Sequence, residues 1–295
     1  MTTLRVAYIP EHFSTPLFLA QKHGFYESRG LQIEFVKVPE GSGRLIQLLN
    51  ANEVDIAIGL TEAFIADIAK GNENVHILDT YVTSPLLWAV STGQDREISR
   101  VQDLAKIGVS RIGSGSYIMS FVLANKLDIA PFTEFEVLSN FKNLRDSVNL
   151  KENVAASDAF MWEYFTSKKY YDTKEIKQID QIYTPWSSWI VASSSSALEK
   201  PLKEFIAAVG EGIDYFNNHL DEGIKYIYET LDYSAEDAKE WSKTVKFNAD
   251  IGKVPLDWEN IVVNTTSILK LAGVLTDSDE TIAKRLLSNV KKTNL

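Results

Sequence analysis

A short apolar run followed by a loop with helix-starting residues occurs four times in this chain. The runs span residues 4–9, 31–38, 54–58 and 107–112. The loops that follow carry, in order, Ser14-Thr15-Pro16, Gly41-Ser42-Gly43, Thr61-Glu62 and Gly113-Ser114-Gly115-Ser116. Each unit predicts a strand whose carboxyl end leads into a helix N-terminus, where backbone N–H groups and the helix dipole favour polar ligands. The pattern therefore predicts an open α/β fold that binds a small molecule.

The order of these units predicts two lobes. The chain has 295 residues, which is long for one compact unit. Its strand and helix pattern pauses in a polar stretch at residues 91–99 and then restarts at Ile107. We expect lobe one to comprise residues 1–87 plus 190–295 and lobe two residues 88–189, each a mostly parallel sheet flanked by helices. Strand-like sequence at 86–90 and 189–192 would carry the two crossings, which together make a hinge.

Two further stretches give local expectations. In lobe two, Val154-Ala155-Ala156 predicts a strand, and a helix is expected from Phe160. Beyond residue 192, helical patterns dominate. We expect helices at about residues 197–219, 222–231, 235–245, 258–271 and 280–290.

Composition excludes several classes of function. A formal charge of −10 argues against nucleic acid and anionic membrane surfaces as partners. No apolar run approaches the ~20 residues that span a bilayer. The absence of cysteine excludes disulfides, thiolate metal sites and a cysteine nucleophile. Strand-like sequence begins at Leu4, ahead of any room for a secretory leader, so we expect a cytoplasmic protein; a leader ahead of this sequence would make it periplasmic or secreted.

Several segments, taken in their order and spacing, resemble one known family. They are Gly30 to Phe35, Gly41, Leu45 to Leu49, Glu53 to Gly59, Val101-Gln102-Asp103-Leu104, Gly113 to Ser116 and Ser157 to Glu163. These segments resemble the type II periplasmic binding proteins of the sulfonate, nitrate and taurine group, which includes thiamine-pyrimidine-precursor binding and synthase proteins. The chain is most similar to the fungal cytosolic members of that group.

The resemblance implies a fold of two α/β lobes that close about a hinge on a small ligand. Synthase members carry a cysteine-rich motif that this chain lacks, so we expect noncatalytic binding, with a pyrimidine-processing enzyme as the alternative. The sequence has neither a GxSxG elbow nor the HxH or HxxxH spacing of a metal site, and we expect no metal and no cofactor. We expect a monomer, without a transporter partner if the protein is cytosolic.

Candidate ligand-binding residues follow from the strand ends and from the resemblance. They are Glu11, His12, Phe13, Ser14, Leu60, Thr61, Glu62, Trp88, Gly113, Ser114, Gly115, Ser116, Asp158, Trp162 and Trp186. The family often has Asp where Ser157 stands, which makes Asp158 the candidate there. Helix capping explains Thr61 equally well, core packing is an alternative for the tryptophans, and a turn with an N-cap is the preferred account of Gly41 to Gly43.

The candidate side chains also indicate the character of the ligand. Carboxylates among the candidates and beside them, including Glu163, disfavour a purely anionic molecule. Aromatic walls and polar donors favour a heteroaromatic, pyrimidine-like or amine-bearing molecule. The family also makes a sulfonate-like ligand an expectation.

Overall fold

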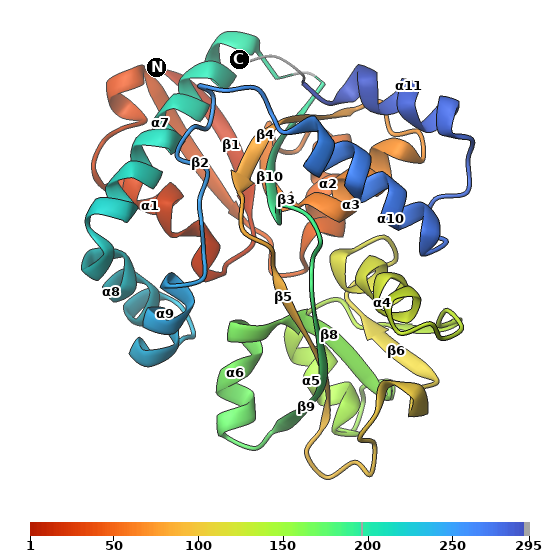
Figure 1. Cartoon of the computed structure of the whole chain (residues 1–295). Helices are drawn as coiled ribbons and strands as arrows, with labels where there is room; N and C mark the ends of the chain where they lie inside the picture. Colours follow the sequence, from red (N-terminus) through yellow and green to blue (C-terminus); the bar gives the residue numbers. More distant parts are fainter. Residues whose placement is uncertain (196, 292–295) are drawn as a thin grey trace.

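The computed structural model describes residues 1–195 and 197–291; residues 196 and 292–295 of the predicted first lobe lie outside this part of the chain. Within it, two five-stranded sheets flanked by helices lie one above the other (Figure 1). The first sheet has the order β2 (Leu31–Lys37), β1 (Thr2–Tyr8), β3 (Ile56–Leu60), β10 (Trp189–Ser194) and β4 (Val75–Val82). The second has the order β7 (Glu134–Val137), β6 (Lys106–Val109), β8 (Ala159–Glu163), β5 (Leu87–Gly93) and β9 (Ile176–Tyr183).

Helices connect these strands and cover the sheets (Figure 1). The α-helices are α1 (Thr15–Lys22), α2 (Ser42–Asn50), α3 (Thr61–Ala69), α4 (Gly115–Lys126), α5 (Phe141–Val148), α6 (Tyr164–Asp172), α7 (Glu199–Asn218), α8 (Leu220–Thr230), α9 (Ala235–Ser242), α10 (Thr265–Leu271) and α11 (Asp279–Asn289). Short 3₁₀ turns are η1 (His12–Ser14), η2 (Glu27–Arg29) and η3 (Val101–Asp103), and η4 (Glu259–Asn264) is a π-helical turn that leads into α10.

In each sheet, one strand runs against the other four. In the first sheet, β1 pairs in parallel with β2 and β3, whereas β10 is antiparallel to β3 and β4. In the second, β6 is parallel to β7 and β8, whereas β5 is antiparallel to β8 and β9. The odd strands β10 and β5 are the ones that enter from the opposite lobe. The sheets are therefore mostly parallel but mixed.

The chain crosses between the sheets twice, in segments that are hydrogen-bonded to each other. It leaves the first sheet after Val82 and returns to it at Trp189. The backbone N–H of Thr184 donates to Leu86 O at 2.9 Å, and the hydroxyl of Ser188 donates to Ser84 O at 2.7 Å. Apart from Leu86, the stretches expected to cross lie instead within β5 and β10, and the crossings occupy residues 83–86 and 184–188.

The expected strand at Val154-Ala155-Ala156 and the expected helix from Phe160 were wrong. The strand is β8, at Ala159–Glu163, and every residue of it is buried between β5 and β6. The helix begins at Tyr164, where the carboxylate of Glu163 accepts the N–H of Thr166 at 2.7 Å and caps it. The longer apolar run therefore formed the buried strand, and the short alanine-rich stretch before it became a loop. This shift places Trp162 and Glu163 at the carboxyl end of a strand.

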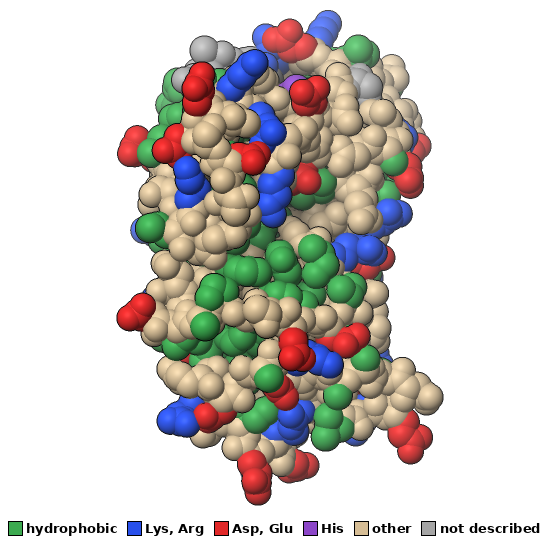
Figure 2. Space-filling view, turned by 90° about the vertical axis from the view of Figure 1, so that its right-hand side faces the viewer, with side chains coloured by type: hydrophobic (Ala, Val, Ile, Leu, Met, Phe, Trp, Pro, Cys, Tyr) green, Lys and Arg blue, Asp and Glu red, His purple; other side chains and the backbone are tan. Residues whose placement is uncertain are grey.

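The face that carries α4, α10 and α11 is apolar at mid-height and charged above and below (Figure 2). Exposed apolar side chains of the described residues on α10 and the preceding η4 include Leu271 and Val263. None of the helices in residues 1–195 and 197–291 is both long and apolar enough to cross a membrane.

Candidate functional site

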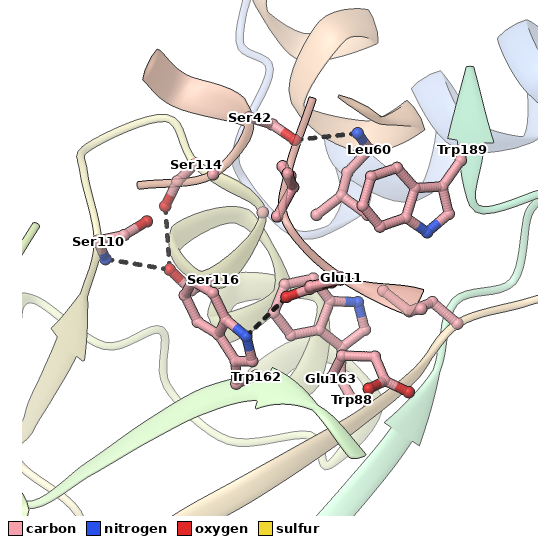
Figure 3. A pocket seen from close by; sticks show the side chains of 14 residues that line it. Glu11, Ser42, Leu60, Trp88, Ser110, Ser114, Ser116, Trp162, Glu163 and Trp189 are labelled. Carbon is pink, nitrogen blue, oxygen red and sulfur yellow. Dashed lines mark hydrogen bonds between the residues drawn. The ribbon is translucent and has the colours of Figure 1, made fainter. Parts of the chain in front are cut away.

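A small cavity lies between the two lobes and is lined by residues from both sheets (Figure 3). Its lining residues are Ile9, Glu11, Gly41, Ser42, Leu60, Leu86, Trp88, Ser110, Ser114, Gly115, Ser116, Trp162, Glu163 and Trp189. The free volume is about 30 Å³. That volume holds one or two water molecules, so an organic molecule needs the walls to move apart.

The cavity lies where strand ends and helix starts from the two lobes face each other. In lobe one, Glu11 follows β1 and Ser42 begins α2. In lobe two, Ser114 is the N-cap of α4, and Trp162 and Glu163 end β8. Because parallel strands place their carboxyl ends on one edge of a sheet, the two edges present helix N-termini to a common space.

One hydrogen bond joins the lobes across this space. The indole Nε1 of Trp162 donates to Glu11 Oε1 at 3.0 Å (Figure 3). Burial, together with the nearby carboxylate of Glu163, raises the pKa of Glu11 to about 8, although the Trp162 bond opposes the shift. Near neutral pH, Glu11 therefore carries its proton in this closed arrangement.

A second contact runs beside it. His12 Nε2 lies 3.4 Å from Glu163 Oε2, without the geometry of a hydrogen bond. The His12 ring is fully buried and stacks between the rings of Tyr233 and Trp241, at centroid distances of 4.4 and 4.2 Å. Burial lowers the pKa of His12, and Glu163 partly opposes that shift. His12 therefore packs behind the residues of the cavity wall and does not line the cavity itself.

Serine hydroxyls fix the polar edges of the cavity. Ser42 Oγ accepts the backbone N–H of Leu60 at 2.9 Å, which ties the end of β3 to the start of α2. Ser116 Oγ accepts the N–H of Ser110 at 3.3 Å and lies 3.0 Å from Ser114 Oγ. These bonds hold the loop ends in place before any ligand arrives.

Two indole N–H groups in the cavity wall have no hydrogen-bond partner among the described residues. They belong to Trp88 and Trp189, whose side chains are buried to 3% and 2% exposure. A buried donor without an acceptor costs free energy of about 1–3 kcal/mol. Both residues line the cavity, and their N–H groups are available to an acceptor.

Gly115 brings the lobes into close contact. A Cβ at this position would lie 2.5 Å from Cδ1 of Leu60 in lobe one and 3.0 Å from Cη2 of Trp88. Only glycine lets the first turn of α4 approach this closely.

The structure brings part of the predicted site to the cavity. The predicted residues that line its wall are Glu11, Leu60, Trp88, Ser114, Gly115, Ser116 and Trp162. The others lie elsewhere: His12 is described above, Phe13 packs on Trp189, and Ser14 donates to Glu11 O at 2.6 Å. Gly113 lies in the loop before α4 with φ +83° and does not line the cavity.

Four more predicted positions, Thr61, Glu62, Asp158 and Trp186, have partners outside the cavity. Thr61 donates its hydroxyl to Ser187 O at 2.6 Å and so anchors a crossing segment.

Trp186 Nε1 donates to Glu62 Oε2 at 2.9 Å, and burial raises the pKa of Glu62 to about 7. Like Trp162 and Glu11, these two residues form an indole–carboxylate hydrogen bond, but Trp186 and Glu62 lie outside the cavity wall. Asp158 accepts from Arg96 at 3.0 Å and from the N–H groups of Ala105 and Lys106 at 2.9 Å, all away from the cavity.

Sequence reasoning missed part of the cavity wall, namely Ile9, Gly41, Ser42, Leu86, Ser110, Glu163 and Trp189. Ser42 had the same signal as the other strand-end loops, but local capping was the preferred account. Trp189 lies three residues after the chosen Trp186, and only the crossing geometry decides which indole enters the cavity. Among the described residues, no group of three or more His, Asp or Glu side chains is placed to hold a metal ion.

A larger groove of about 620 Å³ lies on lobe one between α10 and α11, on the face of Figure 2. It is lined mainly by apolar side chains, including Val262, Leu271 and Ile282. The interlobe cavity is the better candidate site because buried polar groups from both lobes converge there.

Comparisons with known proteins agree with this geometry. The model of the Ca3427-like periplasmic binding proteins matches residues 88–182, and that of the NMT1-like family matches residues 1–86. A solved Candida albicans protein, the CA3427 gene product, is 71% identical with a TM-score of 0.98, and the match covers 100% of this chain and 98% of that one. That protein defines a family with the generic periplasmic binding protein fold.

More distant structures share the fold. The alkanesulfonate-binding protein SsuA of Xanthomonas axonopodis pv. citri, bound to MOPS, has 14% identity and a TM-score of 0.76, with 99% of this chain and 98% of that one covered. The aliphatic sulphonate-binding SsuA of Escherichia coli has 15% identity and a TM-score of 0.69, with 97% of each chain covered. A search of curated proteins gave no match. The resemblance and the fold class expected from the sequence are confirmed, and the chain belongs to the Ca3427-like family of proteins with the periplasmic binding protein fold.

Proposed function

We propose that this protein binds one small polar organic molecule between its lobes and carries out no chemistry on it. The observation that carries the proposal is the pair of buried indole N–H groups, Trp88 and Trp189, which lack an acceptor in the wall of the interlobe cavity. Periplasmic-binding-protein relatives support it, because SsuA was solved with the small molecule MOPS bound.

Binding requires the lobes to move, since the free volume of about 30 Å³ is too small for an organic molecule. The crossing segments 83–86 and 184–188 are the only connections along the chain between the two sheets in the described residues, and rotation about them would open the cavity.

Bonds across the lobes would re-form on closure. Besides Trp162 with Glu11, Thr166 Oγ1 lies 2.8 Å from the hydroxyl of Tyr233, and Tyr170 donates to Asp232 at 2.8 Å. The contacts of Thr166 and Tyr170 link α6 of lobe two to the α8–α9 connection of lobe one. We infer an equilibrium between open and closed forms that a bound molecule shifts toward closure.

The expected ligand classes fit the cavity to different degrees. A pyrimidine-like or other heteroaromatic molecule would stack on the tryptophan rings and offer ring nitrogens to the indole donors. A sulfonate would accept from the same donors and from serine hydroxyls, but it would lie close to Glu11 and Glu163. The alternative of a pyrimidine-processing enzyme predicts product formation or the absorbance of a cofactor, which a pure binder lacks.

A thermal-shift screen of sulfonates, amino acids, pyrimidines and vitamin precursors tests the proposal. A compound at 100 times its dissociation constant should stabilise the protein by about 2.7 kcal/mol.

The matched variants are Trp189→Phe and Trp241→Phe, because both indoles are buried without a hydrogen-bond partner among the described residues but only Trp189 lines the cavity. We expect Trp189→Phe to weaken binding at least tenfold and Trp241→Phe to leave it unchanged. A screen without any stabilising compound, or equal binding by both variants, contradicts the proposal.

A further inference from the structure

The residues that line the interlobe cavity include two carboxylates and no Lys, Arg or His; all of them are in the described part of the chain. Glu11 and Glu163 are buried to 7% and 4% exposure. Their mutual repulsion is one cause of the raised pKa of Glu11. An anion in this cavity would add to the repulsion, whereas a positive charge would relieve it.

The same cavity is walled by three indole rings, those of Trp88, Trp162 and Trp189 (Figure 3). The faces of tryptophan rings attract organic cations, and such aromatic walls recognise ammonium groups in many proteins. Two of these rings, Trp88 and Trp189, also have N–H groups that find no acceptor in residues 1–195 and 197–291. A ligand that satisfies the whole wall therefore combines a positive charge with a hydrogen-bond acceptor.

We propose that the cavity takes a small organic cation that carries an acceptor group, with its positive nitrogen at Glu11 and Glu163 and its acceptor at the indoles of Trp88 and Trp189. The inference rests on the proposed function and names the chemical class of its ligand. The cation takes the place of the Trp162 N–H, which donates to Glu11 at 3.0 Å in the closed form. Separation of Trp162 from Glu11 also supplies part of the volume that an organic molecule needs.

Cation binding is coupled to loss of a proton. The pKa of Glu11 is about 8, so near pH 7 the empty cavity holds a protonated carboxyl, and an ion pair with the ligand drives that proton off. The other titratable groups around Glu11 are Glu163 on β8, Tyr233 ahead of α9 and the adjacent His12. Affinity for the cation should rise by up to about tenfold per pH unit from pH 6 toward 8.

The test uses pairs of probes that differ in charge and little in shape. Choline is compared with 3,3-dimethylbutan-1-ol, its uncharged isostere, and taurine with isethionate, in which a hydroxyl replaces the ammonium. Thermal shift and calorimetry are measured on the full chain, with calorimetry at pH 7 in two buffers of different ionisation enthalpy. We expect the ammonium-bearing member of at least one pair, either choline or zwitterionic taurine, to bind at least tenfold more tightly than its isostere and to release about one proton.

Two carboxylate variants provide the control. Glu11→Gln removes the charge in the cavity, and Glu62→Gln removes the matching carboxylate that pairs with Trp186 outside it. We expect binding of the cation to weaken at least tenfold in Glu11→Gln and to be unchanged in Glu62→Gln. The wild-type isostere comparison and proton count remain decisive if Glu11→Gln does not fold.

The outcomes separate this inference from the proposed function. If only the uncharged or anionic probes bind, and variants of the cavity residues weaken that binding, the ligand is not a cation. The proposed binding function then still holds. Equal affinity of the two members in both pairs, or no proton release when choline or taurine binds, also overturns the cation. If neither these probes nor the wider screen stabilises the protein, the proposed function fails, and the inference fails with it.

Discussion

Glu11→Gln tests whether the buried carboxyl of the cavity is held in its neutral form. The pKa of Glu11 rises from its ordinary value of 4.5 to about 8 on folding, mainly through burial. Below pH 4.5 both the folded and the unfolded protein hold the proton. Between these values the unfolded state loses the proton first, so the stability of the wild type falls as pH rises and the loss is complete above pH 8.

The size of the effect follows from the shift. Each pH unit in this window costs the wild type about 1.4 kcal/mol, so the loss between pH 5 and pH 8 is at most about 4 kcal/mol. Opening of the lobes would hydrate the carboxylate and reduce the loss, which makes this figure an upper limit. The variant Glu11→Gln keeps an acceptor for the Trp162 N–H but cannot ionise, so it should lack this part of the pH dependence.

Urea denaturation of wild type and variant at pH 5, 6, 7 and 8 measures the difference. Other buried carboxyls with raised pKa values, such as Glu62 and Asp79, are present in both proteins and cancel. Glu53→Gln, at an exposed position, is the control for loss of one charge. The stability of Glu11→Gln relative to wild type should increase steadily with pH; a difference constant to within about 0.5 kcal/mol refutes the reasoning.

Three other changes test the geometry around the cavity. Gly115→Ala should destabilise the closed protein by about 1–3 kcal/mol in thermal unfolding, because its Cβ would lie 2.5 Å from Leu60. In the double variant, Leu60→Ala should relieve part of that cost. Trp186→Phe should cost about 1–3 kcal/mol in urea unfolding by removing the donor to buried Glu62, while calorimetry shows ligand affinity unchanged. Asp158→Ala should lose about 2–3 kcal/mol with unchanged affinity, because its carboxylate is bonded away from the cavity; a selective loss of affinity would restore it as a ligand contact.

Much of the fold could be predicted because its signals are local. The apolar runs at 4–9, 31–38 and 54–58 each gave a strand that ends in a helix start, and β1, β2 and β3 lie there. The strand at 159–163 was missed because its apolar run is as short as a helical turn, and only pairing with β5 and β6 decides between them.

The site was less predictable because it depends on contacts between lobes. Glu11 and Ser116 follow directly from their places after strands. The orientation of Trp189 depends on how the chain crosses between sheets, and the role of Ser42 depends on a bond to Leu60, eighteen residues away. Contacts of this kind join residues that are distant in the sequence, so no periodic sequence pattern predicts them.

Indole N–H resonances measure the central claim most directly. The chain has six tryptophans, and each gives one indole cross-peak in a spectrum of protein labelled with ¹⁵N-tryptophan. Titration with the panel compound that raises the melting temperature most should shift the peaks of Trp88, Trp162 and Trp189 and leave those of Trp186, Trp241 and Trp258 in place. Shifts confined to Trp258, which lines the outer groove, or no shift at the three cavity indoles, would contradict a ligand site between the lobes.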